Sequence, residues 1–138
     1  MKTRVEETIK RHDIGYNCAQ AVACTYCDLV GVDEEMMFRI IEAFGAGMGG
    51  LEGTCGALSG ACALAGMKAS TGNLEKPNSK AASYKLSKEI LKQFKEQNGS
   101  VICKELKGIA TGTPLRSCQD CIKDAAAIAE RVLFAEEA

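Results

Sequence analysis

The chain has 138 residues, 46% of them hydrophobic and 25% charged, which predicts a single globular domain spanning residues 1–138. The net charge of −1 and the small aromatic fraction argue against nucleic-acid binding, because no aromatic side chains interleave with the lysines. No run approaches the roughly 18 apolar residues that a membrane-spanning helix needs. The N-terminal segment MKTRVEETIKRHD lacks the apolar core of a signal peptide, so we expect a cytoplasmic protein without membrane insertion.

The first half of the chain predicts three short helices followed by a break. These helices are expected over residues 3–12, 18–30 and 33–44, with Asp33 as an N-cap and Gly31 and Gly45 as stop signals. In the third helix, apolar side chains recur at the i, i+3, i+4, i+7 spacing of a buried helical face. Five glycines then fall within the segment GAGMGGLEG, residues 45–53, which interrupts the helical pattern.

The second half predicts four more helices, over residues 55–65, 79–97, 101–107 and 118–135, with loops over 70–79 and 108–117. In the longest one, apolar residues recur every four positions: Ala82, Leu86, Ile90 and Phe94. The lysines concentrated in residues 68–107 indicate either a solvated helix face or a surface for an acidic partner. We find no alternating strand pattern of useful length, so the predicted fold class is all-α, a compact bundle of five to seven helices.

Eight cysteines are the most unusual feature of the composition. Because thiols stay reduced in the cytoplasm, four structural disulfides are not expected there. Metal ligation, reversible redox cycling and plain packing are the remaining reasons for so many cysteines.

Four predicted helix starts each carry a cysteine close to a residue type that caps helices. An N-cap side chain satisfies free backbone N–H groups, and the partial positive charge of a helix N-terminus favours a thiolate over a thiol. The C-x-x-C pair at the last start also suits a reversible disulfide or two metal ligands. The cap and cysteine pairs are Asn17 with Cys18, Thr54 with Cys55, Ser100 with Cys103, and Ser117 with Cys118 and Cys121.

The other cysteines are predicted to be packing residues. Cys24 and Cys27 lie one turn apart in the middle of a helix, away from any exposed N-terminus. Cys62 shares a helix face with Cys55 but lies two turns away, about 10 Å along the axis, too far for a disulfide. His12, the only histidine, is predicted to be a polar surface residue, although a cysteine–histidine nucleophile pair would have to use it.

The glycine-rich segment allows two interpretations. It is either a flexible connector or a length of backbone that passes close to Cys55 and presents N–H groups to a thiolate, cluster or anion. Gly56 and Gly60, four residues apart, predict close approach of another helix, and they make homo-oligomer formation plausible. Glu52 lies near Cys55 in sequence and is expected either to orient it or to repel it.

Four blocks together resemble the C_GCAxxG_C_C family of redox-active proteins, and the resemblance covers most of the chain. The first is GYNCAQAV at residues 15–22, and the second is GTCGALSG at residues 53–60, with the order Cys-Gly-Ala-x-x-Gly. The third is Cys103-Lys104-Glu105-Leu106 with the following Gly108. The fourth falls at the final helix, where Cys121 fits best and Cys118 leaves the alignment open.

The resemblance implies a small helical protein with redox activity carried by four cysteines. It assigns catalytic or metal-ligating roles to Cys18, Cys55, Cys103 and Cys121, with Cys118 as the competing fourth position. Gly53 and Gly56 are the candidate cofactor-binding residues. An iron–sulfur cluster or zinc is the candidate cofactor, and the redox partner is unknown. Two alternatives remain: a non-enzymatic helical module with a structural four-cysteine zinc site, and an interaction protein whose cysteines only pack the core.

Electrostatics links the geometry of the cysteines to their chemistry. Several thiolates in one low-dielectric pocket repel each other strongly unless a cation lies between them. We therefore expect a metal if all four helix-start cysteines converge, and disulfides if they converge in pairs.

Overall fold

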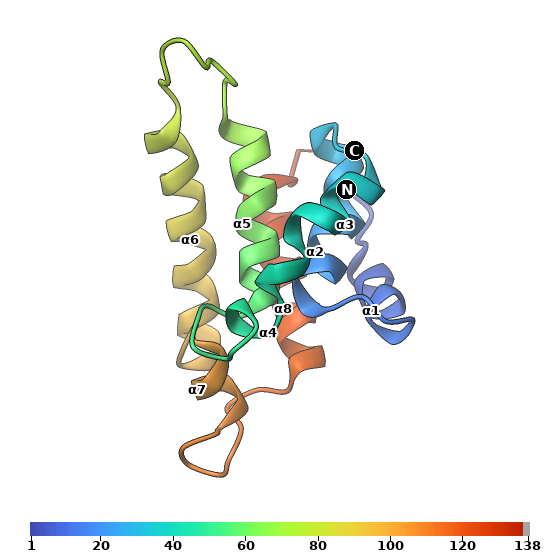
Figure 1. The fold of residues 1–138 in the computed structure, drawn as a ribbon, viewed down its shortest axis with the longest axis vertical. Helices are drawn as coiled ribbons and strands as arrows, with labels where there is room; N and C mark the ends of the chain where they lie inside the picture. Colours follow the sequence, from blue (N-terminus) through green and yellow to red (C-terminus); the bar gives the residue numbers. More distant parts are fainter. Residues whose placement is uncertain (137–138) are drawn as a thin grey trace.

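The computed structural model describes residues 1–136 and is helical, as the sequence predicts (Figure 1). It contains seven α-helices of five residues or more, one four-residue helical turn and two 3-10 helices. These are α1 (Val5–Asp13), α2 (Cys18–Tyr26), η1 (Cys27–Val30), α3 (Glu34–Ile41), η2 (Glu42–Phe44), α4 (Gly45–Met48), α5 (Gly56–Ala69), α6 (Lys80–Asn98), α7 (Cys103–Lys107) and α8 (Cys118–Leu133). Within residues 1–136 there is no strand, only an isolated bridge between Thr54 and Ile102.

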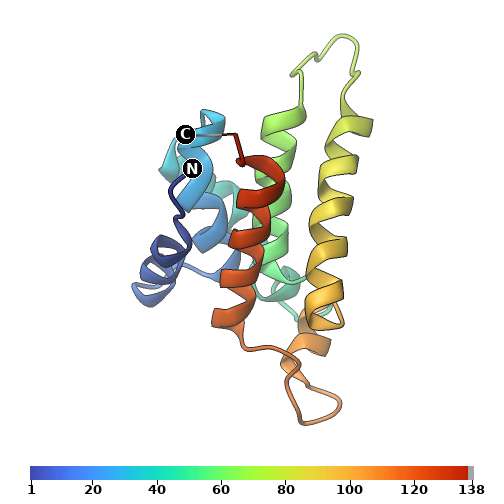
Figure 2. The ribbon, with the colours of Figure 1, turned by 180° about the vertical axis from the view of Figure 1, so that it is seen from behind.

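Helix α5 lies at the centre of the bundle. It runs antiparallel to α6, to which the connection over residues 70–79 joins it, and α8 packs against both (Figures 1 and 2). On its other side α5 packs against α2, and α1 and α3 lie beyond α2. The buried apolar side chains form one cluster with members from α1, α2, α3, α5, α6, α7 and α8, and Leu106 is the member from α7.

The contact between α2 and α5 is close because α5 presents a glycine to the backbone of α2. A Cβ atom placed on Gly60 would lie 2.6 Å from the carbonyl oxygen of Ala19. The predicted close helix approach is therefore made inside one chain. Helix α2 covers the glycine face on which the expectation of a homo-oligomer was based. That face is therefore not available for self-association.

Two predicted boundaries differ from the structure. Helix α5 does not stop near Gly66 but continues to Ala69, because a glycine within a helix costs only about 1 kcal/mol relative to alanine and does not end it. Residues 101–102 are not helical: Ile102 has extended backbone angles and α7 begins at Cys103.

The predicted apolar face of α6 is buried along only part of its length. Ile90 and Phe94 are fully buried and Leu86 is partly buried, but Ala82 is exposed. In Figure 1 the start of α6 lies at the outer edge of the molecule, with the end of α5 beside it and no helix on its outer side, which accounts for this exposure.

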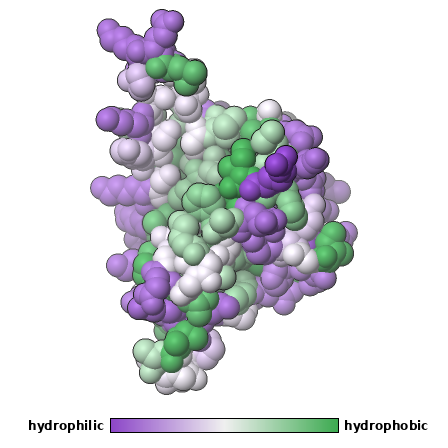
Figure 3. Space-filling model, in the orientation of Figure 1, coloured by the Kyte–Doolittle hydropathy of each residue, from purple (hydrophilic) through white to green (hydrophobic). Residues whose placement is uncertain are grey.

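The lysines of α6 form an exposed face. In Figure 3, hydrophilic side chains line the outer edge of the molecule on the side of α6. Lys80, Lys85, Lys88, Lys92 and Lys95 are all exposed, in agreement with a solvated helix face. Among the described residues, no helix combines the length and the apolar character that crossing a membrane requires.

The two glycines of α5 provide a matched test of the packing. We expect Gly60→Ala to lower the free energy of unfolding by about 1–3 kcal/mol, because its methyl group would push α2 away. Gly66→Ala, with nothing within 4 Å of the new Cβ, should instead raise it by about 0.5–1 kcal/mol. Urea denaturation followed by circular dichroism measures both, and equal effects of the two substitutions would contradict the close packing.

Candidate functional site

The N-termini of α2, α5, α7 and α8 gather at one end of the bundle, opposite the 70–79 connection (Figure 1). Five cysteines from these helix starts line one cavity of about 190 Å³ there. They are Cys18, Cys55, Cys103, Cys118 and Cys121. The structure thus brings together sulfur atoms from four distant stretches of the sequence, including both candidates for the fourth position.

Helix capping holds two of these starts as the sequence predicts. The side chain of Asn17 accepts a hydrogen bond from the backbone N–H of Gln20 at 2.9 Å, and the Gln20 side chain accepts one from the Asn17 N–H, which makes a complete capping box. At α8, the Ser117 side chain accepts from the Asp120 N–H at 3.1 Å.

The other two predicted caps are wrong. Thr54 does not cap α5, because Cys55 itself occupies the N-cap position and no side chain caps that end. The N-cap of α7 is Ile102, and Ser100 accepts a hydrogen bond from the Ile102 N–H instead of capping the helix. Both helices start immediately after an extended segment, and that segment fixes the position of the first helical turn in place of a cap.

A short antiparallel clip positions Cys55 next to Cys103. The Cys55 N–H donates to the carbonyl of Val101 at 2.7 Å, and the Cys103 N–H donates to the carbonyl of Gly53 at 2.9 Å, on either side of the Thr54–Ile102 bridge. Each extended segment of the clip is too short to show an alternating pattern, so the sequence does not reveal the clip. Gly53 belongs to this clip and does not line the cavity, whereas Gly56 does.

The glycine-rich segment packs against the cysteines rather than acting as a loose connector. Gly47 has a φ of +57°, and a Cβ on it would lie 2.5 Å from the Cβ of Cys103. Ala46, Met48 and Leu51 also have positive φ angles, which cost roughly 1–3 kcal/mol each in residues other than glycine. Backbone strain of this kind concentrates at functional sites, and here it directs the Ala46 N–H at the sulfur of Cys18.

Cys55 is the cysteine that this environment activates. The pKa of Cys55 is lowered to about 7, and the largest cause is a hydrogen bond from the Cys121 thiol. Burial opposes this shift, while the Ala57 and Leu58 N–H groups of the α5 N-terminus and the charge of Lys107 add to it. A substantial fraction of Cys55 is therefore thiolate near neutral pH, which is the form that attacks disulfides.

The neighbouring cysteines behave in the opposite way. Burial raises the pKa of Cys18 and of Cys103 above the usual range, despite their positions at helix starts. The pKa of Cys121 is raised first by its hydrogen bond to Cys55 and then by burial. These pKa values run against the expectation that each helix start holds a thiolate: for Cys18 and Cys103 the cost of burying charge outweighs the helix dipole, and for Cys121 the hydrogen bond to Cys55 keeps the thiol protonated.

The cavity is also lined by residues for which the sequence predicted no role in the site. Lys107 lies one turn after Cys103 on α7, a spacing that could have revealed it. The negative charge of Cys118 and a hydrogen bond to its sulfur raise the pKa of Lys107. His12 and Arg116 line the cavity as well, so His12 is not merely a surface residue. Glu52 is directed elsewhere: it is exposed and forms an ion pair with Lys104 at 2.8 Å.

Metal binding is the alternative use of the cysteines that line this cavity. Across residues 1–136, no group of three or more His, Cys, Asp or Glu side chains has an arrangement suited to holding a metal ion. The cysteines therefore do not fit an iron–sulfur cluster or zinc ion in this arrangement, and the predicted metal ligation by Cys18, Cys55, Cys103 and Cys121 gains no support from the geometry.

A family of known proteins matches most of the chain. The family model described as "Putative redox-active protein (C_GCAxxG_C_C)" matches residues 16–132, which include all five cysteines of the cavity. The chain belongs to this family. No curated protein and no solved structure matches it.

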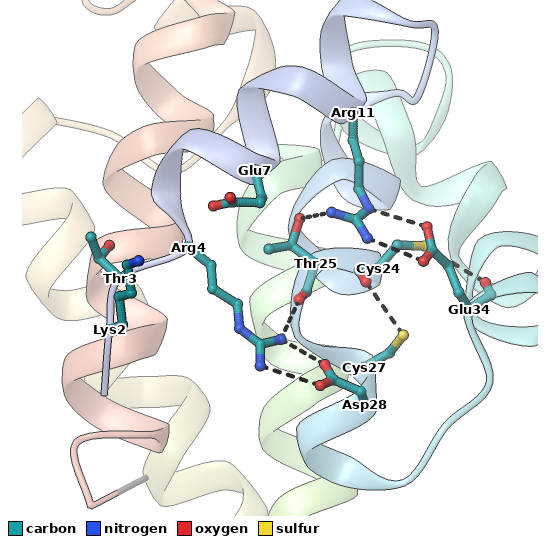
Figure 4. A pocket seen from close by; sticks show the side chains of 10 residues that line it. All are labelled: Lys2, Thr3, Arg4, Glu7, Arg11, Cys24, Thr25, Cys27, Asp28 and Glu34. Atoms are coloured by element: carbon teal, nitrogen blue, oxygen red, sulfur yellow. Dashed lines mark hydrogen bonds and ion pairs between the residues drawn. The ribbon is translucent and has the colours of Figure 1, made fainter. Parts of the chain in front are cut away.

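The remaining cysteines of this C_GCAxxG_C_C protein lie outside the cavity. Figure 4 shows Cys24 and Cys27 in a larger pocket of about 510 Å³ between α1, α2 and α3. The Cys24 thiol donates to the carbonyl of Glu34 and the Cys27 thiol donates to that of Cys24. Burial raises the pKa of Cys24 to about 12 and that of Cys27 above its usual range, so both are neutral packing residues as expected.

Four of the charged groups that line that pocket form two ion pairs. Arg4 forms an ion pair with Asp28 at 2.7 Å and Arg11 with Glu34 at 3.1 Å (Figure 4). Both pairs fasten α1 to the elements that follow it. Cys62, on α5, is half-buried and hydrogen-bonded to Ser87 of α6, and burial raises its pKa.

The pH dependence of alkylation tests the activation of Cys55. Because its pKa lies near 7, below the usual range of about 8.5, we expect its iodoacetamide reaction to gain rate as the pH rises through 7. Cys121→Ala removes the hydrogen-bond donor and should move this midpoint upward, toward the usual range. Peptide mass spectrometry resolves Cys55 from the other sites, and Cys62→Ala is the control that leaves the midpoint in place. A midpoint that is the same with and without Cys121 would contradict the assigned cause.

Proposed function

We propose that the protein is a thiol–disulfide redox protein in which Cys55 is the attacking thiolate and Cys121 the resolving thiol. The observation that supports this most directly is the pair itself. One cysteine with a lowered pKa is hydrogen-bonded to one with a raised pKa, inside a cavity shared by three more thiols. A nucleophilic thiolate beside a protonated partner is the arrangement that disulfide exchange requires.

The chemistry needs two steps. The Cys55 thiolate attacks one sulfur of a substrate disulfide, forming a mixed disulfide and releasing the first substrate thiolate. Cys121 then loses its proton and attacks the Cys55 sulfur, forming the Cys55–Cys121 disulfide and releasing the second substrate thiolate. Two electrons thus pass from the protein to the substrate, and the reverse sequence oxidises a dithiol. Lys107, which lowers the pKa of Cys55, stabilises the thiolates that form in the cavity.

We take Cys121 rather than Cys118 as the partner of Cys55, because a hydrogen bond from the Cys121 thiol is the main cause of the lowered pKa of Cys55. Cys103, which is buried, and Cys18, which is partly buried, line the same cavity, and we assign them a supporting role as further exchange partners. Gly56 leaves room for the sulfur of Cys18 beside the start of α5, while Gly53 sets the clip that carries Cys103.

A reducing compartment such as the cytoplasm suits this function. All eight cysteines carry free thiols in the structure, which agrees with cycling of one pair rather than with a disulfide framework. The electron donor would be a further thiol protein or a small thiol.

A redox titration with mapping of the thiols tests the proposal. After anaerobic reduction, we expect equilibration with increasing ratios of oxidised to reduced glutathione to yield one reversible disulfide, between Cys55 and Cys121. Cys55→Ser and Cys121→Ser should each abolish it, whereas Cys62→Ser should retain it. Alkylation before tryptic digestion and mass spectrometry identifies the pair.

Two results would contradict the proposal. Thiols in the cavity that never oxidise reversibly would favour an interaction protein with packing cysteines. Stoichiometric zinc or iron in freshly purified protein, lost together with the fold on chelation, would favour the four-cysteine metal site.

A further inference from the structure

The cysteines of the cavity differ sharply in how accessible they are. The buried ones have exposed fractions of 6% for Cys55, 6% for Cys103 and 3% for Cys121, whereas Cys118 is exposed at the rim. The cavity holds about 190 Å³, below the range of roughly 300–1,000 Å³ that accommodates drug-sized ligands. Because Cys55 is buried in so small a cavity, its sulfur is less accessible to the disulfide of a protein than to a small disulfide.

We propose that Cys118 is the entry thiol through which macromolecular disulfides exchange electrons with the buried Cys55–Cys121 pair. This inference rests on the proposed function of that pair, and it assigns the substrate class as disulfides carried on proteins. Cys118 is the one cysteine of the cavity that is exposed to solvent and also lies one turn from a member of the buried pair.

The surroundings of Cys118 suit an exchange thiol. It is the first residue of α8, directly after the Ser117 N-cap, so its backbone is held by the capped first turn. Lys107, from α7, hydrogen-bonds to its sulfur and places a positive charge beside it. Arg116, just before α8, pairs with Asp124 at 3.0 Å and so anchors the segment that carries Cys118.

The buried pair is within reach of Cys118 through Cys121. The two are three residues apart on α8, and side chains at that spacing have Cβ atoms about 5–6 Å apart. A disulfide needs Cβ atoms about 3.5–4.5 Å apart, so closing a Cys118–Cys121 bond requires only a small adjustment of the first helical turn.

The relay consists of three exchanges. The Cys118 thiolate attacks the macromolecular disulfide, forms a mixed disulfide and releases the first substrate thiolate. Cys121 then attacks the Cys118 sulfur, passing its proton to the Cys55 thiolate, and releases the second substrate thiolate. Cys55 finally gives up that proton and attacks Cys121, which forms the Cys55–Cys121 disulfide and returns Cys118 to a thiolate. Two electrons reduce one substrate disulfide, and one proton is released to solvent.

Two probes of different size separate this relay from direct attack. The small probe is 2,2′-dipyridyl disulfide, and the large one is a pyridyl disulfide coupled to dextran. Both release pyridine-2-thione, whose absorbance gives the rate, and mass spectrometry then maps the disulfides. The proteins are the reduced full chain, Cys118→Ser, Cys121→Ser and the control Cys62→Ser.

With the large probe we expect the unsubstituted chain and Cys62→Ser to form the Cys55–Cys121 disulfide and release free dextran thiol. Cys118→Ser should slow this reaction by more than about tenfold, because the two thiols of the buried pair are less accessible to a macromolecule. With the small probe it should still form the Cys55–Cys121 disulfide, which also shows that the variant is folded. Cys121→Ser should stop at the first exchange and retain dextran on Cys118.

Other outcomes identify which claim fails. If Cys118→Ser forms the Cys55–Cys121 disulfide equally fast with both probes, or if dextran stays on Cys118 in the unsubstituted chain, the relay is overturned while the function of the pair stands. If the unsubstituted chain forms no Cys55–Cys121 disulfide even with the small probe, the proposed function itself fails, and the relay fails with it.

Discussion

The close approach of α5 to α2 is the constraint on which the cysteine site depends. Gly60 lets the backbone of α5 meet the carbonyl of Ala19, and one turn earlier Gly56 leaves space for the sulfur of Cys18 and for the backbone at Gly45. With larger side chains at these positions the two helices would separate, and the N-terminus of α2 would leave the cavity. The small residues of α5 thus determine which sulfur atoms can be neighbours, before any question of their reactivity arises.

Burial and helix dipoles act in opposite directions on the thiols brought together in this way. Placing several negative charges in one small cavity is costly, and a metal ion is one way to offset that cost. This protein shows another: Cys18, Cys103 and Cys121 have raised pKa values, and Cys55 receives a hydrogen bond from one of them. Protonation of the neighbours removes most of the repulsion, which makes full convergence compatible with free thiols. From the sequence we expected either a metal ion or separate disulfide pairs, and protonated thiols gathered in one cavity are a third possibility.

Much of the fold and the membership of the site could be predicted from sequence, for identifiable reasons. The caps at Asn17, Asp33 and Ser117 and the stop at Gly31 act through neighbouring residues, and local pattern captures such effects. The exposed Ala82 could not be predicted, since burial of a helix face depends on where the other helices end. Nor could the clip between Thr54 and Ile102, which joins segments nearly fifty residues apart through single backbone pairs. The order of reactivity among the cysteines depends on how deeply each one is buried, and the spacing of Cys residues does not show this.

The connection over residues 70–79 has a practical consequence. It is almost entirely exposed and caps the projecting end of the α5–α6 hairpin, at the far end of α5 from the sulfur atoms (Figure 1). Loop tips of this kind tolerate insertions well. An affinity tag, a fluorophore or a tether to an electrode attached there would leave the opposite pole of the molecule free, so that electron exchange could be followed on immobilised protein oriented in a single direction.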